Sequence, residues 1–208
     1  MYKVIILFSG RGTNLLSVIN ESNKDNSLFK IDLAITDNPN AFGIQYPHTC
    51  GIDCTILPEK KWEEHLLNIL DKSNPDLIVL AGFMKVLHNK FCLKWDGKCI
   101  NIHPSLLPKY PGLNTHQQVL KNSDKEHGCS IHLVTPIVDG GKVIAQSSLN
   151  VLFGEDIGHL SHRVLKMEND LLPAVVKSFA EGRLRYYKGT MYFEDTPIFK
   201  PLNLGDLL

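Results

Sequence analysis

The segment Asn101-Ile102-His103-Pro104 places an amide and an imidazole two residues apart at the end of an apolar run. If Ile102 is buried in a strand, Asn101 and His103 lie on the same side of it. An amide can donate a hydrogen bond to a developing oxyanion, and an imidazole can move a proton or supply positive charge. The alternative is a buried histidine that only contacts backbone carbonyls. Spacing gives the other histidines no special role, and His127 and His132 are structural candidates beside a strand.

An aspartate is followed by two glycines at Asp139-Gly140-Gly141, a pattern that usually marks a turn. The functional alternative is that this turn holds Asp139 against His103. A carboxylate in that position would orient the imidazole and stabilise its charged form. Spacing alone does not show that the two residues meet, so both interpretations stay open.

A glycine-containing loop, Ser9-Gly10-Arg11-Gly12-Thr13-Asn14, separates an apolar run from a helical pattern. Such a loop lets the backbone approach a ligand, and the free N–H groups at a helix start attract phosphate. The third glycine of the dinucleotide fingerprint is absent, because Leu15 stands there, and Asp37 only loosely replaces its acid. The loop therefore favours a mononucleotide or sugar phosphate over NAD, with a plain turn as the alternative.

Other reaction chemistries have little support in the sequence. There is no Gly-x-Ser-x-Gly elbow, and Ser105 and Ser130 lack a base at a diagnostic spacing. No His-x-x-x-His and no paired carboxylate–His pattern occurs. The five cysteines form no Cys-x-x-Cys pair, which is typical of reduced structural thiols in a cytoplasm. We expect a metal-independent Asn/His/Asp site that acts on a carbonyl near a phosphate loop.

The elements that must position these residues alternate between strand and helix in the first half of the chain. Buried strands are predicted at 4–8, 31–35, 76–81 and 99–102. A helical spacing begins at Leu15, and another runs from Trp62 to Leu70, with Pro58 suited to its first turn and Asn74-Pro75 to its end. This alternation predicts a parallel α/β sheet with helices on both faces.

The pattern changes after residue 125. Strands at 130–134 and 143–151 are separated by so few residues that antiparallel pairing is favoured. A single long helix is predicted over 156–181, with a kink or break at Pro173, and a small hairpin is predicted around Gly189. With no linker or repeat, the sequence predicts one domain with a mixed sheet.

Composition limits the partners. The chain has 208 residues, with 22 Lys and Arg against 22 Asp and Glu, so its formal net charge is zero. This balance argues against a protein that coats nucleic acid or an anionic membrane. The apolar run at residues 1–8 is too short for a signal peptide or a membrane span. We therefore expect a cytoplasmic protein whose partners are small molecules.

Longer segments resemble a known family, the phosphoribosylglycinamide formyltransferases, which are folate-dependent enzymes of purine biosynthesis. The similar segments cover nearly the whole chain in order, and NIHPSLLPKYPG at 101–112 is the most specific of them; the others are VIILFSGRGTNL, LAGFMKVL, HGCSIHLVTPIVDGGKVIAQ and FAEGRL. The resemblance implies a Rossmann-like formyltransferase fold over 1–208, with a phosphate-binding half at 1–100. It implies a catalytic and folate-binding half at 101–208 and either a monomer or a homodimer.

The resemblance also implies residue roles. Asn101, His103 and Asp139 match the catalytic trio. Residues matching the ribonucleotide site are Gly12, Thr13, Asn14, Pro104 and Glu168. Residues matching the folate site are Met84, Lys85, Val86, Leu87, Asn101, Thr135, Pro136, Ile137, Val138 and Asp139. The sequence departs from the family at Lys85, where arginine is common, at Pro136, where an acid is common, and at Pro47, which interrupts a segment that is usually helical.

The implied reaction is transfer of a formyl group from 10-formyltetrahydrofolate to the amine of 5-phosphoribosylglycinamide, without a metal. Formylation of another amine, formyltetrahydrofolate hydrolysis and non-catalytic mononucleotide binding remain alternatives. Both implied substrates are anionic, so a protein of zero net charge must hold them locally. Backbone N–H groups at 12–14 suit the phosphate, and Lys85, Lys60 or Lys61 suit the folate tail.

Overall fold

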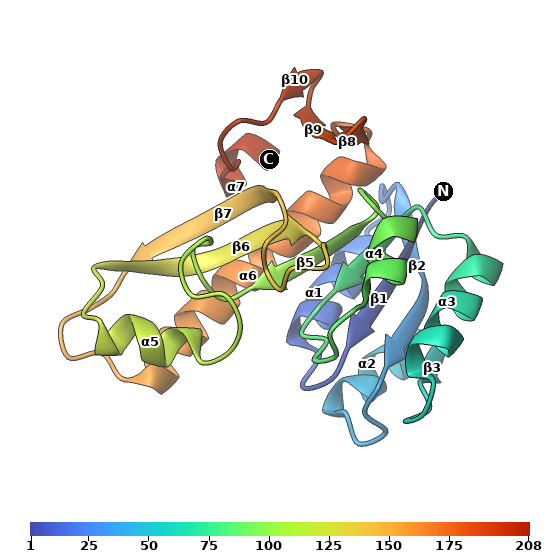
Figure 1. Ribbon diagram of the computed structural model, residues 1–208, viewed down its shortest axis with the longest axis horizontal. Helices are drawn as coiled ribbons and strands as arrows, with labels where there is room; N and C mark the ends of the chain where they lie inside the picture. Colours follow the sequence, from blue (N-terminus) through green and yellow to red (C-terminus); the bar gives the residue numbers. More distant parts are fainter.

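The computed structural model describes residues 1–208 and is built on a seven-stranded sheet in the order β3-β2-β1-β4-β5-β6-β7 (Figure 1). Its strands are β1 (Tyr2–Phe8), β2 (Phe29–Thr36), β3 (Cys54–Ile56), β4 (Leu77–Leu80), β5 (Cys99–His103), β6 (Glu126–Leu133) and β7 (Val143–Asn150). The pairings from β3 to β5 are parallel, whereas β5, β6 and β7 pair antiparallel. The predicted mixed sheet is confirmed.

Helices cover both faces of this sheet. The helices are α1 (Thr13–Ser22), α2 (Gln45–Thr49), α3 (Trp62–Ser73), α4 (Asn89–Lys94), α5 (Thr115–Lys121), α6 (Ile157–Ala180) and α7 (Leu204–Leu207), with a 3₁₀ turn at Phe42–Ile44. Strand β1 is buried from Val4 to Phe8 and divides these side chains between two cores, because successive residues point to opposite faces. Val4, Ile6 and Phe8 pack with α1 and α6, whereas Ile5 and Leu7 pack with α3 and α4.

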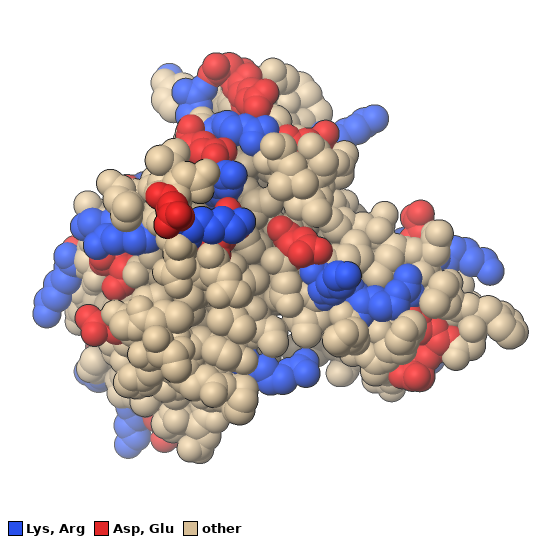
Figure 2. Space-filling view, turned by 180° about the vertical axis from the view of Figure 1, so that it is seen from behind, with Lys and Arg blue, Asp and Glu red and all other residues tan.

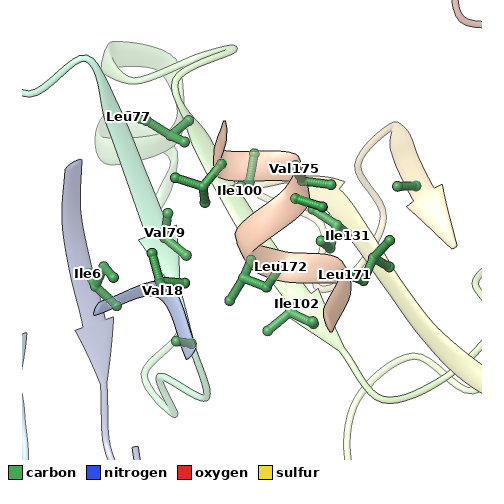
Figure 3. Packing of buried hydrophobic residues seen from close by; sticks show 14 of the residues in the cluster. Ile6, Val18, Leu77, Val79, Ile100, Ile102, Ile131, Leu171, Leu172 and Val175 are labelled. Carbon is green, nitrogen blue, oxygen red and sulfur yellow. The ribbon is translucent and has the colours of Figure 1, made fainter. Parts of the chain in front are cut away.

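Helix α6 is the main support behind the second half of the sheet. Figure 3 shows Leu171, Leu172 and Val175 of this helix packed over the strand residues Ile100 and Ile131. The expected boundaries are confirmed, since Asp156 caps the helix by accepting from the N–H of His159, and Glu181 follows its last turn. Of the kink or break predicted at Pro173, the break is wrong, because the helix is continuous for 24 residues. Burial of the helix around Pro173 outweighs the loss of one N–H donor.

Two other proline predictions also need correction. Pro58 is not in a helix, because α3 begins only at Trp62 and the N–H of Leu57 still bonds the strand residue Thr36. Pro47 does not interrupt the helical segment, since it lies inside α2. Its position in the first turn, where no intrahelical donor is needed, explains why the helix forms. The short edge strand β3, with three residues, was not predicted.

The chain ends in a separate antiparallel sheet of three strands. It consists of β8 (Leu184–Tyr187), β9 (Thr190–Phe193) and β10 (Thr196–Pro197). The hairpin predicted around Gly189 is confirmed, with Tyr187 paired to Thr190 across the turn. Figure 1 shows this sheet beyond the carboxyl end of α6, away from α5. None of the helices combines the length and apolar composition needed to cross a membrane.

A pair of histidines attaches α5 to the sheet. Nδ1 of His116 on α5 lies 2.9 Å from Nε2 of His127 on β6, whose side chain is buried. One nitrogen must donate and the other accept, so this contact suits imidazoles that are not both charged. Burial, followed by the proximity of His116, lowers the pKa of His127 to about 4.

This histidine should make the fold acid-sensitive. The pKa of His127 in the folded chain lies below that of an unfolded histidine, which is near 6.5. The neutral, buried His127 therefore contributes fully to stability above pH 6.5, and this contribution is lost as the pH falls toward 4. The loss amounts to roughly 3 kcal/mol in the free energy of unfolding. Urea unfolding of the wild type and His127→Gln between pH 7 and pH 4 measures it. In the exposed variant His48→Gln, the free energy of unfolding should change with pH as it does in the wild type. The same pH dependence in His127→Gln would contradict the role given to His127.

Candidate active site

A cleft of about 630 Å³ opens beyond the carboxyl ends of β1, β4 and β5. This is the edge of a parallel sheet at which ligands usually bind, beside the point where the strand order reverses. Of the predicted site residues, those that line the cleft are Asn14, Met84, Lys85, Val86, Leu87, Asn101, His103, Pro104, Thr135, Ile137, Val138, Asp139 and Glu168. Gly12, Thr13 and Pro136 do not line it, although Gly12 and Thr13 directly precede Asn14.

Strand β5 carries the amide and the imidazole into the cleft. Ile102 is 4% exposed and belongs to the core, so the neighbouring Asn101 and His103 share the opposite face, as the strand alternation predicted. His103 is 5% exposed, and Nε2 of its ring lies 2.9 Å from the carbonyl oxygen of Tyr110. The histidine therefore has one ring nitrogen fixed by the backbone and the other directed elsewhere.

The other nitrogen of His103 faces Asp139. Nδ1 lies 3.3 Å from Oδ2 of the carboxylate, and the same oxygen accepts a 2.7 Å hydrogen bond from the N–H of Gly112. Asp139 has a positive φ of 51°, so the Asp-Gly-Gly segment is indeed a tight turn, and it also presents the carboxylate to the imidazole. The segment is therefore both the turn and the support for His103 that the sequence analysis gave as alternatives.

The electrostatics of the pair follow from burial and partners. Burial lowers the pKa of His103 overall, and the Tyr110 carbonyl and the Asp139 carboxylate offset only part of this effect. Burial would raise the pKa of Asp139, but His132, the Gly112 N–H and the charge of His103 outweigh it and lower the pKa overall. Asp139 is therefore ionised near neutral pH, and a proton on Nδ1 of His103 would meet a carboxylate.

His132 is a site residue that the sequence analysis treated as structural. It is 2% exposed and lies on β6 directly opposite Asn101. Its Nδ1 lies 2.8 Å from the Leu133 carbonyl oxygen, and its Nε2 lies 3.0 Å from Asn101 Nδ2. Nε2 is also 3.4 Å from Asp139. The β5–β6 register is the signal that would have found it, because cross-strand partners share a face.

The loop after β5 supplies two further contacts that sequence reasoning missed. The Tyr110 carbonyl and the Gly112 N–H hold His103 and Asp139 respectively. The hydroxyl of the buried Ser105 donates to carbonyls of this loop, at 2.7 Å to Lys109 and 3.2 Å to Tyr110. Because these contacts involve mainly backbone atoms, the residue types in the sequence do not predict them.

The loop between β1 and α1 forms the opposite side of the cleft. Gly12 has a positive φ of 75°, and a Cβ there would lie 2.7 Å from the Cα of Gly43, so only glycine fits. The N–H groups of Thr13 and Asn14, at the start of α1, bond no acceptor within the chain. Backbone donors without acceptors at a helix start suit a phosphate group.

Asn14 connects this loop to α6. Its Nδ2 donates to Glu168 at 3.0 Å, and its Oδ1 is buried without a partner. Burial raises the pKa of Glu168, an effect that the bond from Asn14 partly offsets. A buried acceptor that lacks a donor, beside a carboxyl group, suits the hydroxyl groups of a sugar.

The segment after β4 gives the cleft an apolar rim. Met84 and Val86 are 65% and 58% exposed, and across the cleft Ile137 and Val138 are 72% and 52% exposed. Lys85 also lines the cleft, with its Nζ 3.9 Å from Asp37. Lys60 and Lys61 are not among the residues that line the cleft, so a contact between them and a ligand tail stays a prediction. No cluster of three or more His, Cys, Asp or Glu side chains has a geometry that could hold a metal ion.

The fold and the site thus define an α/β protein with a ligand cleft at the carboxyl edge of its sheet. The family model described as formyl transferase matches residues 2–176. The chain is 36% identical to the phosphoribosylglycinamide formyltransferase of Escherichia coli over 197 residues, covering 92% of this chain and 93% of that protein. The enzyme of the same name from Haemophilus influenzae is 36% identical over 200 residues, with coverage of 93% and 94%.

A solved structure agrees with these sequences. The phosphoribosylglycinamide formyltransferase of Coxiella burnetii superimposes with a TM-score of 0.91 at 35% identity, covering 97% of this chain and 98% of that one. The chain therefore belongs to the formyl transferase family and, within it, to the phosphoribosylglycinamide formyltransferases, enzymes of purine biosynthesis.

The turn that carries Asp139 gives a first test of the site. A Cβ on Gly141 would lie 1.8 Å from the Leu133 carbonyl oxygen, so Gly141→Ala must displace the turn. Misplacement of a catalytic group by about 1 Å can cost on the order of 100-fold in rate, and we expect a loss of that size. Steady-state formyl transfer and thermal unfolding measure activity and fold. Gly158→Ala is the control, since its new Cβ would come no closer than 3.1 Å to a neighbouring atom, the carboxylate oxygen of Asp156. An active Gly141→Ala enzyme would contradict the prediction.

Proposed function

We propose that this chain transfers the formyl group of 10-formyltetrahydrofolate to the amine of 5-phosphoribosylglycinamide, giving N-formylglycinamide ribonucleotide in de novo purine biosynthesis. The observation that carries the proposal is the convergence of Asn101, His103 and Asp139 at the centre of the cleft. An amide donor, an imidazole and a carboxylate together suit an addition reaction at a carbonyl carbon. The names of the relatives support the choice of substrates.

The amine substrate fits the side of the cleft formed by α1 and α6. Its phosphate would bind the free N–H groups at Thr13 and Asn14, which follow Gly12. Its ribose hydroxyls would bond Glu168 and the unpartnered Oδ1 of Asn14, beside Pro104. This arrangement satisfies a buried polar atom that has no partner within the chain.

The formyl donor fits the apolar rim. A folate has a flat ring system, which would lie among Met84, Val86 and Leu87 on one side and Ile137 and Val138 on the other. Residues 135–139 would form the loop over the ring, with Thr135 and Pro136 at its start, and Lys85 would lie toward the carboxylate tail. The folate is a co-substrate in this proposal, and no metal takes part.

The reaction begins with attack of the substrate amine on the formyl carbon, which places a negative charge on the formyl oxygen. Asn101 Nδ2 contacts His132 at 3.0 Å and donates a longer bond of 3.4 Å to Asp139. In the proposal, the N–H that makes the longer bond turns to donate to this oxyanion. Both ring nitrogens of His103 face acceptors of the protein, a carbonyl and a carboxylate. That arrangement satisfies an imidazolium, whose positive charge next to Asn101 stabilises the oxyanion.

The proton balance involves Asp139. The attacking amine gains a positive charge and must lose a proton, while N10 of the folate must gain one before the C–N bond to the formyl carbon breaks. In the proposal, the carboxylate of Asp139 accepts the first proton, directly or through water, and delivers it to N10. Its lowered pKa keeps it ionised, and therefore able to accept, near neutral pH.

The wider setting of the reaction is part of the same proposal. We treat residues 1–208 as one domain, in which 1–100 contributes the phosphate loop and 101–208 the reacting groups. The enzyme would work in the cytoplasm on small molecules, without nucleic acid or membrane partners. On the face shown in Figure 2, basic and acidic side chains are intermixed, which suits local capture of small anions better than binding to a polyanion.

Substitution of the central groups tests this mechanism. Loss of one oxyanion-stabilising group typically costs about 10²–10³ in rate, so His103→Ala and Asp139→Asn should each lower turnover by at least that factor. A spectrophotometric assay of 10-formyltetrahydrofolate deformylation, with and without 5-phosphoribosylglycinamide, measures it. His65→Ala, on the exposed side of α3, is a matched control that should keep full activity.

The same assay separates the competing functions. Turnover in the absence of any amine would identify a formyltetrahydrofolate deformylase. Turnover with other amines, but not with 5-phosphoribosylglycinamide, would identify a different formyltransferase. Binding of both substrates without transfer would indicate a non-catalytic module, and a fully active His103→Ala enzyme would refute the assigned mechanism.

A further inference from the structure

The cleft contains one basic side chain that has no acidic partner. Arg11 and Lys85 are the only lysine or arginine residues that line it. Lys85 is already engaged, with its Nζ 3.9 Å from Asp37 and 5.6 Å from the centre of the Trp62 ring. Arg11 is exposed, and its guanidinium makes no ion pair and no hydrogen bond within the chain. Its charge is therefore available to a ligand.

The position of Arg11 places this charge beside the phosphate loop. It lies between β1 and α1, one residue before Gly12, and lines the cleft together with Asn14. The N–H groups of Thr13 and Asn14 lack acceptors, and the buried Oδ1 of Asn14 lacks a donor. These unpartnered atoms are independent signs that a polar ligand binds on this side of the cleft.

A count of charges shows that the helix start alone is insufficient for a phosphate monoester. The N-terminus of a helix contributes the equivalent of roughly half a positive charge. A phosphate monoester carries about −1.5 to −2 near pH 7. The carboxyl group of Glu168 lies in the same cleft, and the first turn of α1 contains no basic residue. A basic side chain nearby would complete the neutralisation, and Arg11 is the lysine or arginine of the cleft that has no acidic partner.

We propose that Arg11 determines the specificity of the amine site for a phosphorylated substrate, by binding the phosphate of 5-phosphoribosylglycinamide from the mouth of the cleft. The proposal rests on the proposed function, since that function supplies the phosphate. A guanidinium can bind two phosphate oxygens at once and stays charged at all relevant pH values. The backbone N–H groups orient the phosphate, and Arg11 neutralises it.

Binding measurements test this role without turnover. Calorimetric titration of 5-phosphoribosylglycinamide, with no formyl donor present, gives the Kd for the wild type, Arg11→Gln and Arg11→Lys. Loss of a charged hydrogen-bonding partner should raise the Kd roughly ten- to hundredfold in Arg11→Gln. Arg11→Lys should recover part of the affinity, because it keeps the charge but not the planar pair of donors.

Two comparisons make the result specific. Arg185→Gln removes an exposed arginine that pairs with Asp195 in the C-terminal sheet, outside the cleft, and should bind as the wild type does. The dephosphorylated amine, glycinamide riboside, lacks the group that Arg11 recognises. With this amine at concentrations below its KM, Arg11→Gln and wild type should therefore give equal kcat/KM for formyl transfer.

The outcomes separate this proposal from the proposed function. An unchanged Kd for 5-phosphoribosylglycinamide in Arg11→Gln would overturn the role of Arg11, while formyl transfer by the wild type would still support the function. An equal loss of kcat/KM with the phosphorylated and dephosphorylated amines would also overturn it, because the arginine would then act on the fold or the chemistry. No binding or formylation of 5-phosphoribosylglycinamide by the wild type would refute the proposed function itself.

Discussion

The carboxylate of Asp139 joins segments that are far apart in the sequence. Its oxygens meet His103 at the end of β5, the N–H of Gly112 in the following loop and His132 on β6. The Asp-Gly-Gly turn brings the carboxylate there. This turn requires glycine at 141, because a side chain at that position would collide with the Leu133 carbonyl. Without this negative charge, burial would leave His103 with the Tyr110 carbonyl as its only favourable partner. The hydrogen-bond geometry of the site and its capacity to hold positive charge thus depend on one residue.

The cleft offers local binding sites for anions in a protein with no net charge. The proposed substrates are anions, and a neutral chain offers no global attraction to them. Positive potential is instead concentrated at a helix start and at the unpaired Arg11, both at the carboxyl edge of the parallel strands. The apolar rim around Met84 and Ile137 offers little charge and suits a flat ring. Local dipoles and single side chains can therefore do what a basic surface does in proteins that bind polyanions.

Much of this arrangement was predictable because it follows from short-range periodicity. The apolar strands and the burial of Ile102 placed Asn101 and His103 on one face. The proximity of Asp139 to His103 was not predictable from spacing, since it depends on how a loop folds back over another strand. His132 was missed because its role appears only with the β5–β6 register, and the contacts of Tyr110 and Gly112 use backbone atoms. Helix α6 continues through Pro173 because the packing of the helix outweighs the tendency of proline to break it.

The central claim is that Asp139 supports positive charge on His103. A direct measurement is the pKa of His103 by NMR titration of the labelled imidazole, in the wild type and in Asp139→Asn. Because the carboxylate raises the pKa of His103 against the effect of burial, the substitution should lower that pKa further. An unchanged or higher pKa in a folded Asp139→Asn protein would show that the two residues are not coupled, and would contradict the account.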